Sequence, residues 1–170
     1  MADFTQYAPL LKECEGYGNF TDDPSDRGGA TMSGVTLSAF RAFFGKDKGI
    51  ADLRSMTERQ WSQIMKAGYW DKLRADDYRN QSVAEICADW CVNSGPGIAK
   101  KVQALVGANP DGDIGPQSLA LINGSDQRSL FNRIKDARVE YYNRLAAIDR
   151  TQERFLRGWL NRLEKFHFNQ

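Results

Sequence analysis

Residues 15–36 read EGYGNFTDDPSDRGGATMSGVT and interrupt a chain whose other segments have helical spacing. The apolar residues before this stretch recur at the three-and-four spacing of an amphipathic helix: Phe4, Tyr7, Leu10, Leu11 and Cys14. Five glycines and one proline between residues 16 and 35 forbid a regular helix there. The stretch therefore predicts turns and a small irregular hairpin, directly after a helix that ends at Glu15 and Gly16.

Helical patterns dominate the rest of the chain. Three residues with capping side chains start predicted helices, namely Thr36 before a helix to Phe44, Thr57 before a helix to about Ala67, and Ser82 before a strongly apolar helix. Further helices are expected over residues 98–106, 117–122, 126–148 and 152–166, with Pro116 at the first position of the second of these. The sequence thus predicts a mostly α (α+β) fold with one small β element.

Composition excludes several classes of protein. The chain has 170 residues, is 41% hydrophobic and carries a formal net charge of +1, which is not typical of a disordered chain. No apolar run is long enough to span a bilayer, so we expect no membrane insertion. The near-zero net charge gives no general attraction to nucleic acid, and the mixed charges after residue 126 are typical of solvated helix faces. We expect one compact monomer with no nucleic-acid partner.

The start of the chain, MADFTQYAPLLKECEG, lacks the basic beginning and the uninterrupted apolar core of a Sec-type signal peptide. We therefore expect synthesis in the cytoplasm without a signal peptide, so that any action outside the cell follows release or export by another route.

The cysteines and the single histidine narrow the possible chemistry. Cys14, Cys87 and Cys91 lie in apolar helical patterns, which favours buried free thiols over a disulfide set or a zinc site. His167 lies three residues from the C-terminal residue, a poor place for a Ser-His or Cys-His catalytic pair. No metal or cofactor is expected. If the protein is an enzyme, its catalytic groups are therefore carboxylates.

Carboxylates gather around the hairpin. Glu15 ends a helix beside an open loop, and that loop returns Asp22, Asp23, Asp26 and then Thr31. Hydrolysis of a glycosidic bond needs one protonated carboxyl for the leaving oxygen and a second group that holds water or stabilises the sugar cation. The same residues also fit a solvated turn, in which aspartates bond the backbone, or less well a calcium loop, because the ligand register of an EF-hand is missing.

The stretch at 15–36 resembles the start of glycoside hydrolase family 108, whose pattern is roughly E-G-G-Y followed by D-P-x-D-x-G-G-x-T-x-x-G-[IV]-T. In this chain Glu15 is followed by Gly-Tyr-Gly instead. The later stretch DWCVNSGPGIAKKVQALVGANPDGDIGPQSLALI resembles the predicted peptidoglycan-binding region that accompanies this family. FLRGWLNRLEKF resembles the closing helix of that region. Together these segments cover most of the chain in the expected order.

This resemblance implies a lysozyme-like fold, a helical body with a β hairpin beside the catalytic cleft. It implies a catalytic region over residues 1–92 and a helical peptidoglycan-binding region over 93–170, packed as one compact unit. The family's catalytic glutamate corresponds to Glu15. By analogy with phage-type lysozymes, Asp26 and Thr31 hold the attacking water.

Sugar subsites need flat apolar faces and hydrogen-bonding groups. The candidate substrate-binding residues are Tyr17, Phe20, Tyr69, Trp70 and Asn93. Trp90 is assigned to the core because it shares a helix face with Ile86, and the turn Asp111-Gly112-Asp113 is interpreted as structural.

The resemblance implies an N-acetylmuramidase that cleaves the β-1,4 bond between N-acetylmuramic acid and N-acetylglucosamine, with the glycan strands of peptidoglycan as partner. Endolysins and proteins labelled secretion activators occur among such relatives. Two alternatives stay open, a lytic transglycosylase acting on the same bond and a non-catalytic cell-wall-binding or secretion-related module. A nucleic-acid binder that uses the arginine-rich C-terminal helices is a more distant fourth.

Overall fold

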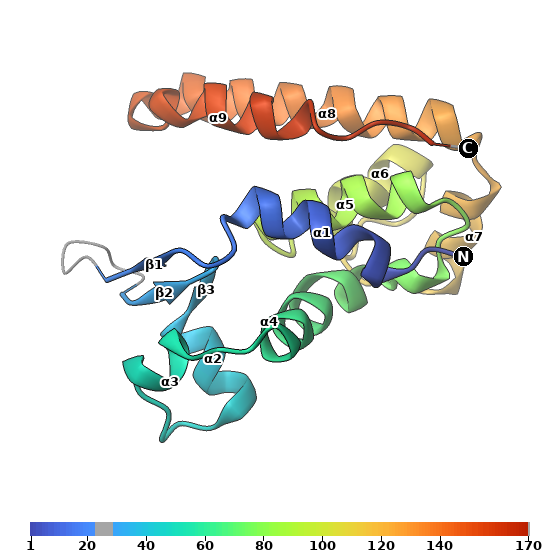
Figure 1. Cartoon of the computed structure of the whole chain (residues 1–170). Coiled ribbons are helices and arrows are strands. Elements are labelled where there is room, and N and C mark those ends of the chain that lie inside the picture. The colour runs from blue at the N-terminus through green and yellow to red at the C-terminus, as the bar shows by residue number, and fades with distance from the viewer. Residues whose placement is uncertain (23–28, 170) are drawn as a thin grey trace. The chain divides into compact units, whose positions relative to one another are not determined.

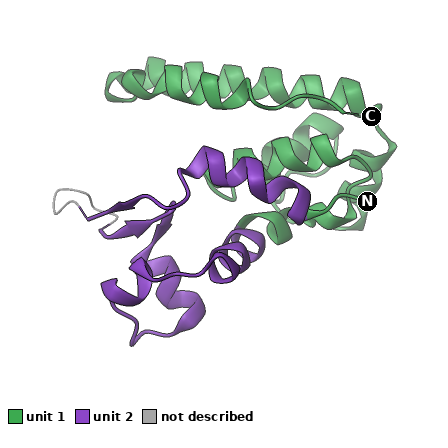
Figure 2. Cartoon of the chain, viewed as in Figure 1, with its two compact units in different colours: residues 1–3, 69–170 green, residues 4–68 purple. Residues whose placement is uncertain are grey.

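A computed structural model of the chain describes residues 1–22 and 29–169. The chain divides into two compact units, shown in Figure 2. Unit 2 comprises residues 4–68, and unit 1 comprises residues 1–3 and 69–170. Both are built mainly from helices, and one small antiparallel sheet lies in unit 2 (Figure 1). The predicted class, mostly α with one small β element, is confirmed.

Unit 2 contains one long helix, the sheet and three shorter helices. In chain order these are α1 (Phe4–Glu15), β1 (Phe20–Thr21), β2 (Thr31–Met32), β3 (Val35–Thr36), α2 (Leu37–Phe44), α3 (Ile50–Arg54) and α4 (Glu58–Met65). The strands follow one another in the order β1-β2-β3, all antiparallel. Thr36 caps α2 through its side chain, and Thr57 caps α4 with a capping box, as predicted.

A two-residue turn joins β2 to β3. Its residues, Ser33 and Gly34, have φ values of 53° and 79°, and Met32 pairs with Val35 across the turn. Two positive φ values in succession are typical of the type I′ turn, whose twist matches that of the flanking strands. Glycine adopts this backbone at no steric cost, whereas Ser33 needs external support for it.

Unit 1 begins within a π-helical turn (Lys66–Trp70) and continues through short 3-10 turns into the longer helices. These are α5 (Gln81–Ser94), α6 (Ile98–Val106), α7 (Pro116–Gly124), α8 (Gln127–Ile148) and α9 (Glu153–Leu163). The core forms where α5 packs against α6 and α8, and α9 packs along α8. Pro116 occupies the first turn of α7, as predicted.

A buried charge network lies at the centre of unit 1. The carboxylate of Asp89, fully buried on α5, accepts hydrogen bonds from Arg138 on α8 at 2.9 Å and from Arg162 on α9 at 2.7 Å. Burial alone would raise the pKa of Asp89, but the two guanidinium groups together hold the pKa below its usual range. Asp89 is therefore ionised and links three helices.

Two details differ from the sequence-based predictions. The apolar helix α5 begins at Gln81 with Asn80 as its cap, because the Asn80 side chain accepts from the Val83 amide. Ser82 lies inside the helix, and its hydroxyl instead accepts from the amide of Asn169. The short helix α3 was not predicted.

The three cysteines are free thiols. Cys87 and Cys91 are buried in unit 1 and Cys14 is half-buried in unit 2. Across residues 1–22 and 29–169, no helix is both long enough and apolar enough to cross a bilayer. The predicted boundary between a catalytic and a binding region at residue 92 stays a prediction, because compactness does not show which residues meet substrate.

Candidate active site

Glu15 is the last residue of α1, and its side chain is half-buried. The next residue, Gly16, has a φ of 62°, a left-handed conformation that ends the helix. The chain then folds back on α1, since the amide of Tyr17 donates to the carbonyl of Lys12 at 2.9 Å. The predicted helix end at Glu15 and Gly16 is confirmed, and the carboxyl stands at a rigid helix terminus.

The turn between β2 and β3 packs directly against this carboxyl. A Cβ atom at Gly34 would lie 3.3 Å from Cδ and 3.4 Å from Cβ of Glu15, and it would collide with Oε2. Gly34 also has a φ of 79°, so a side chain there would be strained for two independent reasons. The structure thus brings the turn at Gly34 against Glu15.

Ser33 fixes the turn from three sides. Its amide donates to the carbonyl of Asn19 at 2.8 Å, its hydroxyl accepts from the amide of Gly18 at 2.9 Å, and its carbonyl accepts from Nε1 of Trp61 at 2.9 Å. Ser33 and Trp61 are both buried. These bonds tie the loop after Glu15 and helix α4 to one turn. Sequence analysis did not identify Ser33 or Trp61 for this role, and the Ser-Gly pair at a turn was the available signal.

Tyr17 is exposed beside Glu15. It retains 38% of its accessible surface, and its ring meets Trp61 edge-on with the centroids 5.4 Å apart. The Lys12 ammonium lies 5.1 Å from the Tyr17 ring centroid and forms an ion pair with Glu58. Tyr17 thus offers an ordered aromatic surface in the same unit as Glu15.

Thr31 and Phe20 also lie in unit 2, on neighbouring strands. Thr31 is on β2, in the hairpin that Gly34 closes, and its hydroxyl donates to the carbonyl of Gly29 at 3.3 Å. Phe20 is on β1, and the Arg54 guanidinium lies 4.2 Å from its ring centroid, which covers one ring face. Asp26, the predicted partner of Thr31, lies outside the described residues.

The other predicted substrate-binding residues belong to unit 1. Trp70 is only 1% exposed and donates from Nε1 to Asp76 at 2.6 Å, so its ring is part of the core and offers no face to a sugar. Tyr69 and Asn93 are half-buried, in the π-helical turn and near the end of α5 respectively. The prediction that Trp90 is a core residue is confirmed, since it is 1% exposed.

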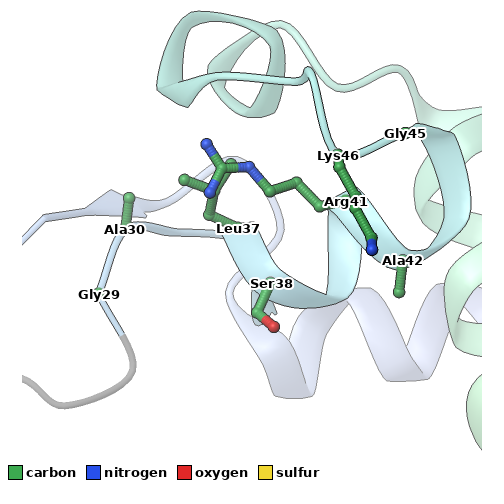
Figure 3. Close-up of a pocket in the computed structure, with 8 residues that line it drawn as sticks. All are labelled: Gly29, Ala30, Leu37, Ser38, Arg41, Ala42, Gly45 and Lys46. Atoms are coloured by element: carbon green, nitrogen blue, oxygen red, sulfur yellow. The ribbon is translucent and has the colours of Figure 1, made fainter.

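Unit 2 also contains a pocket of about 720 Å³ between α2 and the segment that leads into β2 (Figure 3). Its lining residues are Gly29, Ala30, Leu37, Ser38, Arg41, Ala42, Gly45 and Lys46. Among the described residues, none that is predicted to act in catalysis or substrate binding lines it. The candidate catalytic groups therefore lie around Glu15 and not in this pocket.

The turn Asp111-Gly112-Asp113 has a structural role, as interpreted from the sequence. The buried Gln103 donates from Nε2 to Asp111 at 2.8 Å and to the Asp113 carbonyl at 2.9 Å, and its Oε1 accepts from the Gly112 amide. One side chain of α6 thus holds the whole turn before α7.

Comparisons with known proteins show the family to which the chain belongs. Residues 10–95 match the family Glycosyl hydrolase 108, and residues 99–164 match a predicted peptidoglycan domain. The structure of SagA from Brucella abortus is similar, with a TM-score of 0.80 and 30% sequence identity over 96% of this chain and 90% of SagA. A comparison with curated proteins returns no match.

The matched segments contain the residues on which the resemblance was based. The glycosyl hydrolase match includes Glu15 and the whole hairpin, and the peptidoglycan match spans α6 to α9. The likeness to SagA confirms the predicted lysozyme-like fold. The chain belongs to glycosyl hydrolase family 108 and is a glycoside hydrolase that acts on peptidoglycan.

Proposed function

We propose that the protein is an N-acetylmuramidase that hydrolyses the β-1,4 bond between N-acetylmuramic acid and N-acetylglucosamine, with Glu15 as general acid. The observation that carries this proposal is the position of Glu15. Its half-buried carboxyl is held at the end of α1 against the glycine of a two-residue turn. The Gly34 turn packs closely against this carboxyl and fixes its position, as a proton donor requires.

A second group is needed besides the acid. In an inverting reaction this group holds the water that attacks the sugar on the face opposite the leaving oxygen. Thr31 supports this role because its hydroxyl donates a hydrogen bond to the Gly29 carbonyl. The hydroxyl oxygen can then still accept a hydrogen bond from water. Asp26 is proposed as the carboxylate that completes the pair. Tyr17 is proposed to contact a sugar ring, because it is exposed beside Glu15 and held by Trp61.

The test is digestion of purified peptidoglycan by the wild type and by Glu15→Gln, with the products identified by mass spectrometry. Glutamine keeps the size of the side chain but has no acidic proton, so we expect a loss of roughly 10²- to 10⁴-fold in rate. Wild type should release hydrated muropeptides with reducing muramic acid ends. The matched control is Glu13→Gln, an exposed glutamate on the same helix, which should leave the rate unchanged.

Each other outcome overturns a defined part of the proposal. Products lighter by one water would replace hydrolysis by a lytic transglycosylase reaction in which Glu15 is still the acid. Equal rates for the wild type and Glu15→Gln would remove Glu15 from the reaction. Wall binding by folded wild type without any new reducing ends would identify a non-catalytic module.

A further inference from the structure

A second pocket lies within unit 1, where α5, α6 and α8 meet. Its volume is about 270 Å³, enough for a short fragment of a polymer. Trp90 comes from α5, Lys101 and Leu105 come from α6, and Glu140, Tyr141 and Arg144 come from α8. Helices that pack on one another hold all of these residues, so the pocket belongs to the rigid core of the unit.

Trp90 has a hydrogen-bond donor with no partner. Its Nε1 is buried and bonds no atom in the described part of the chain. Trp61 and Trp70 are equally buried, but their Nε1 atoms donate to the Ser33 carbonyl and to Asp76. A buried donor without an acceptor costs free energy of folding. The Trp90 side chain lines the pocket, so its indole signal reports on a ligand that binds there.

The rim of the pocket carries more positive than negative charge. Lys101 and Arg144 are exposed cations that form no ion pair within the described residues, and Glu140 is the single carboxylate beside them. The Lys101 ammonium lies 5.0 Å from the Tyr141 ring centroid, and the Tyr141 ring meets Trp90 edge-on at 5.7 Å. Two cations against one carboxylate favour an anionic ligand.

We propose that this pocket binds the stem peptide of peptidoglycan through a free carboxylate, which Lys101 and Arg144 receive at the rim while the Trp90 and Tyr141 rings form its aromatic wall. The glycan strand cannot supply the anion, because its muramic acid carboxyl is consumed in the amide bond to the peptide, whereas the peptide keeps free carboxylates. Leu105 and the neighbouring alanines of the pocket provide an apolar floor for alanine methyl groups.

This inference rests on the proposed function in one respect, the choice of peptidoglycan as substrate. It adds a function for α6 and α8, which belong to the part of the chain that matches the predicted peptidoglycan domain. An anchor on the peptide lowers KM for substrates that carry stems and leaves kcat for the glycosidic bond unchanged.

The first experiment titrates ¹⁵N-labelled Glu15→Gln protein with a synthetic stem tetrapeptide that has free carboxylates. The indole signal of Trp90, assigned by its loss in Trp90→Phe, should shift, whereas those of Trp61 and Trp70 should stay in place. Lys101→Ala with Arg144→Ala should weaken binding at least tenfold. The matched control is Lys72→Ala with Arg59→Ala, which removes two exposed cations elsewhere and should bind as tightly as the parent.

Three results would overturn the proposal: no shift of the Trp90 signal at millimolar peptide, equal binding by the Lys101/Arg144 double variant, or equal binding of a peptide whose carboxylates are amidated. A shift caused by N-acetylglucosamine oligomers instead would assign the pocket to sugar. None of these readouts requires catalysis. Failure of the stem-peptide proposal is therefore distinguishable from failure of the muramidase proposal, which Glu15→Gln digestion tests alone.

Discussion

The helical core of unit 1 and the region of unit 2 around Glu15 and the β2–β3 turn each contain a carboxylate. Different contacts hold the two carboxylates in place. Asp89 is fully buried and bonded by two guanidinium groups that belong to helices far along the chain. Glu15 is half-buried, and the turn at Gly34 packs against it. The first arrangement pairs the carboxylate with two cations, and the second packs the backbone of a turn against the carboxylate.

This difference separates a structural carboxylate from the proposed catalytic one. A carboxylate saturated by two arginines is stable as an anion and has no proton to give, so Asp89 stabilises the fold. A carboxylate positioned by backbone and sterics can exchange its proton with a substrate oxygen. Burial and strong electrostatic partners alone would have selected Asp89 as the functional site. Partial exposure together with close glycine packing supports the proposed role of Glu15.

The largest effect on stability is expected from Asp89→Asn. Removing the anion leaves Arg138 buried without a countercharge, and the free energy of unfolding should fall by about 3–5 kcal/mol. For a chain of this size, Tm should fall by roughly 10 °C or more. Thermal and urea unfolding measure the change.

The matched control for Asp89→Asn is Glu164→Gln, which removes an ion pair with Lys135 whose glutamate side chain is 72% exposed. This variant should lower the free energy of unfolding by less than about 1 kcal/mol. Similar losses for the two variants would show that the buried network is not the main electrostatic contribution to unit 1.

A large effect on activity is expected from Gly34→Ala. The new methyl group would collide with the Glu15 carboxyl, so the rate of peptidoglycan hydrolysis should fall about 10- to 100-fold, in line with small displacements of catalytic groups. The control is Gly107→Ala, because Gly107 has a similar φ of 75° but open space around its Cα. Gly107→Ala should lose about 1 kcal/mol of stability from its backbone conformation alone, and Gly34→Ala should lose more because of the added collision.

Activity measurements on folded protein separate the two effects. Only Gly34→Ala should lose activity beyond its loss of stability. Equal activity of the two variants would mean that the Gly34 contact does not position Glu15.

A smaller effect on stability is expected from a change of pH. The change in the free energy of unfolding comes only from the difference between the pKa of Asp89 in the folded chain and in the unfolded chain. Its pKa is lower in the folded chain than in the unfolded chain, so the unfolded state takes up the proton first on acidification. The stabilisation is complete above the ordinary aspartate range, near pH 4, and is lost as pH falls through the folded pKa. Tm of the wild type should therefore fall more steeply below pH 4 than Tm of Asp89→Asn. Parallel curves for the two proteins would contradict this assignment.

Local signals in the sequence were sufficient for much of the fold. The helix end at Glu15 and Gly16 and the caps at Thr36 and Thr57 depend on neighbouring residues alone, and all were predicted. The start of α5 was placed two residues late, because Asn80 and Ser82 both have capping side chains and only the distant Asn169 decides between them.

The arrangement of the candidate site depends on contacts between residues that lie far apart in the sequence. Ser33 holds its turn through Trp61, which is 28 residues away, and Asp89 meets Arg162 across 73 residues. No local pattern specifies either pair. Trp70 was predicted to contact sugar from its aromatic character, whereas the π-helical turn that contains it places the ring in the core. Which aromatic residues face substrate depends on such packing and not on residue type.

The smallest effect is expected from Glu58→Gln, which removes the ion pair between Lys12 and Glu58 in unit 2. The Glu58 side chain is 66% exposed, so solvent screens the pair, and the free energy of unfolding should change by less than about 1 kcal/mol. Lys12 also lies over the rings of Tyr17 and Trp61, and these contacts remain in the variant. Tyr17 should therefore keep its place, and hydrolysis should change by less than about twofold, consistent with an exposed pair of this strength. A loss of activity comparable to that of Gly34→Ala would mean that the corner around Glu15 depends on charge, as the core around Asp89 does, and would remove the distinction between the two regions.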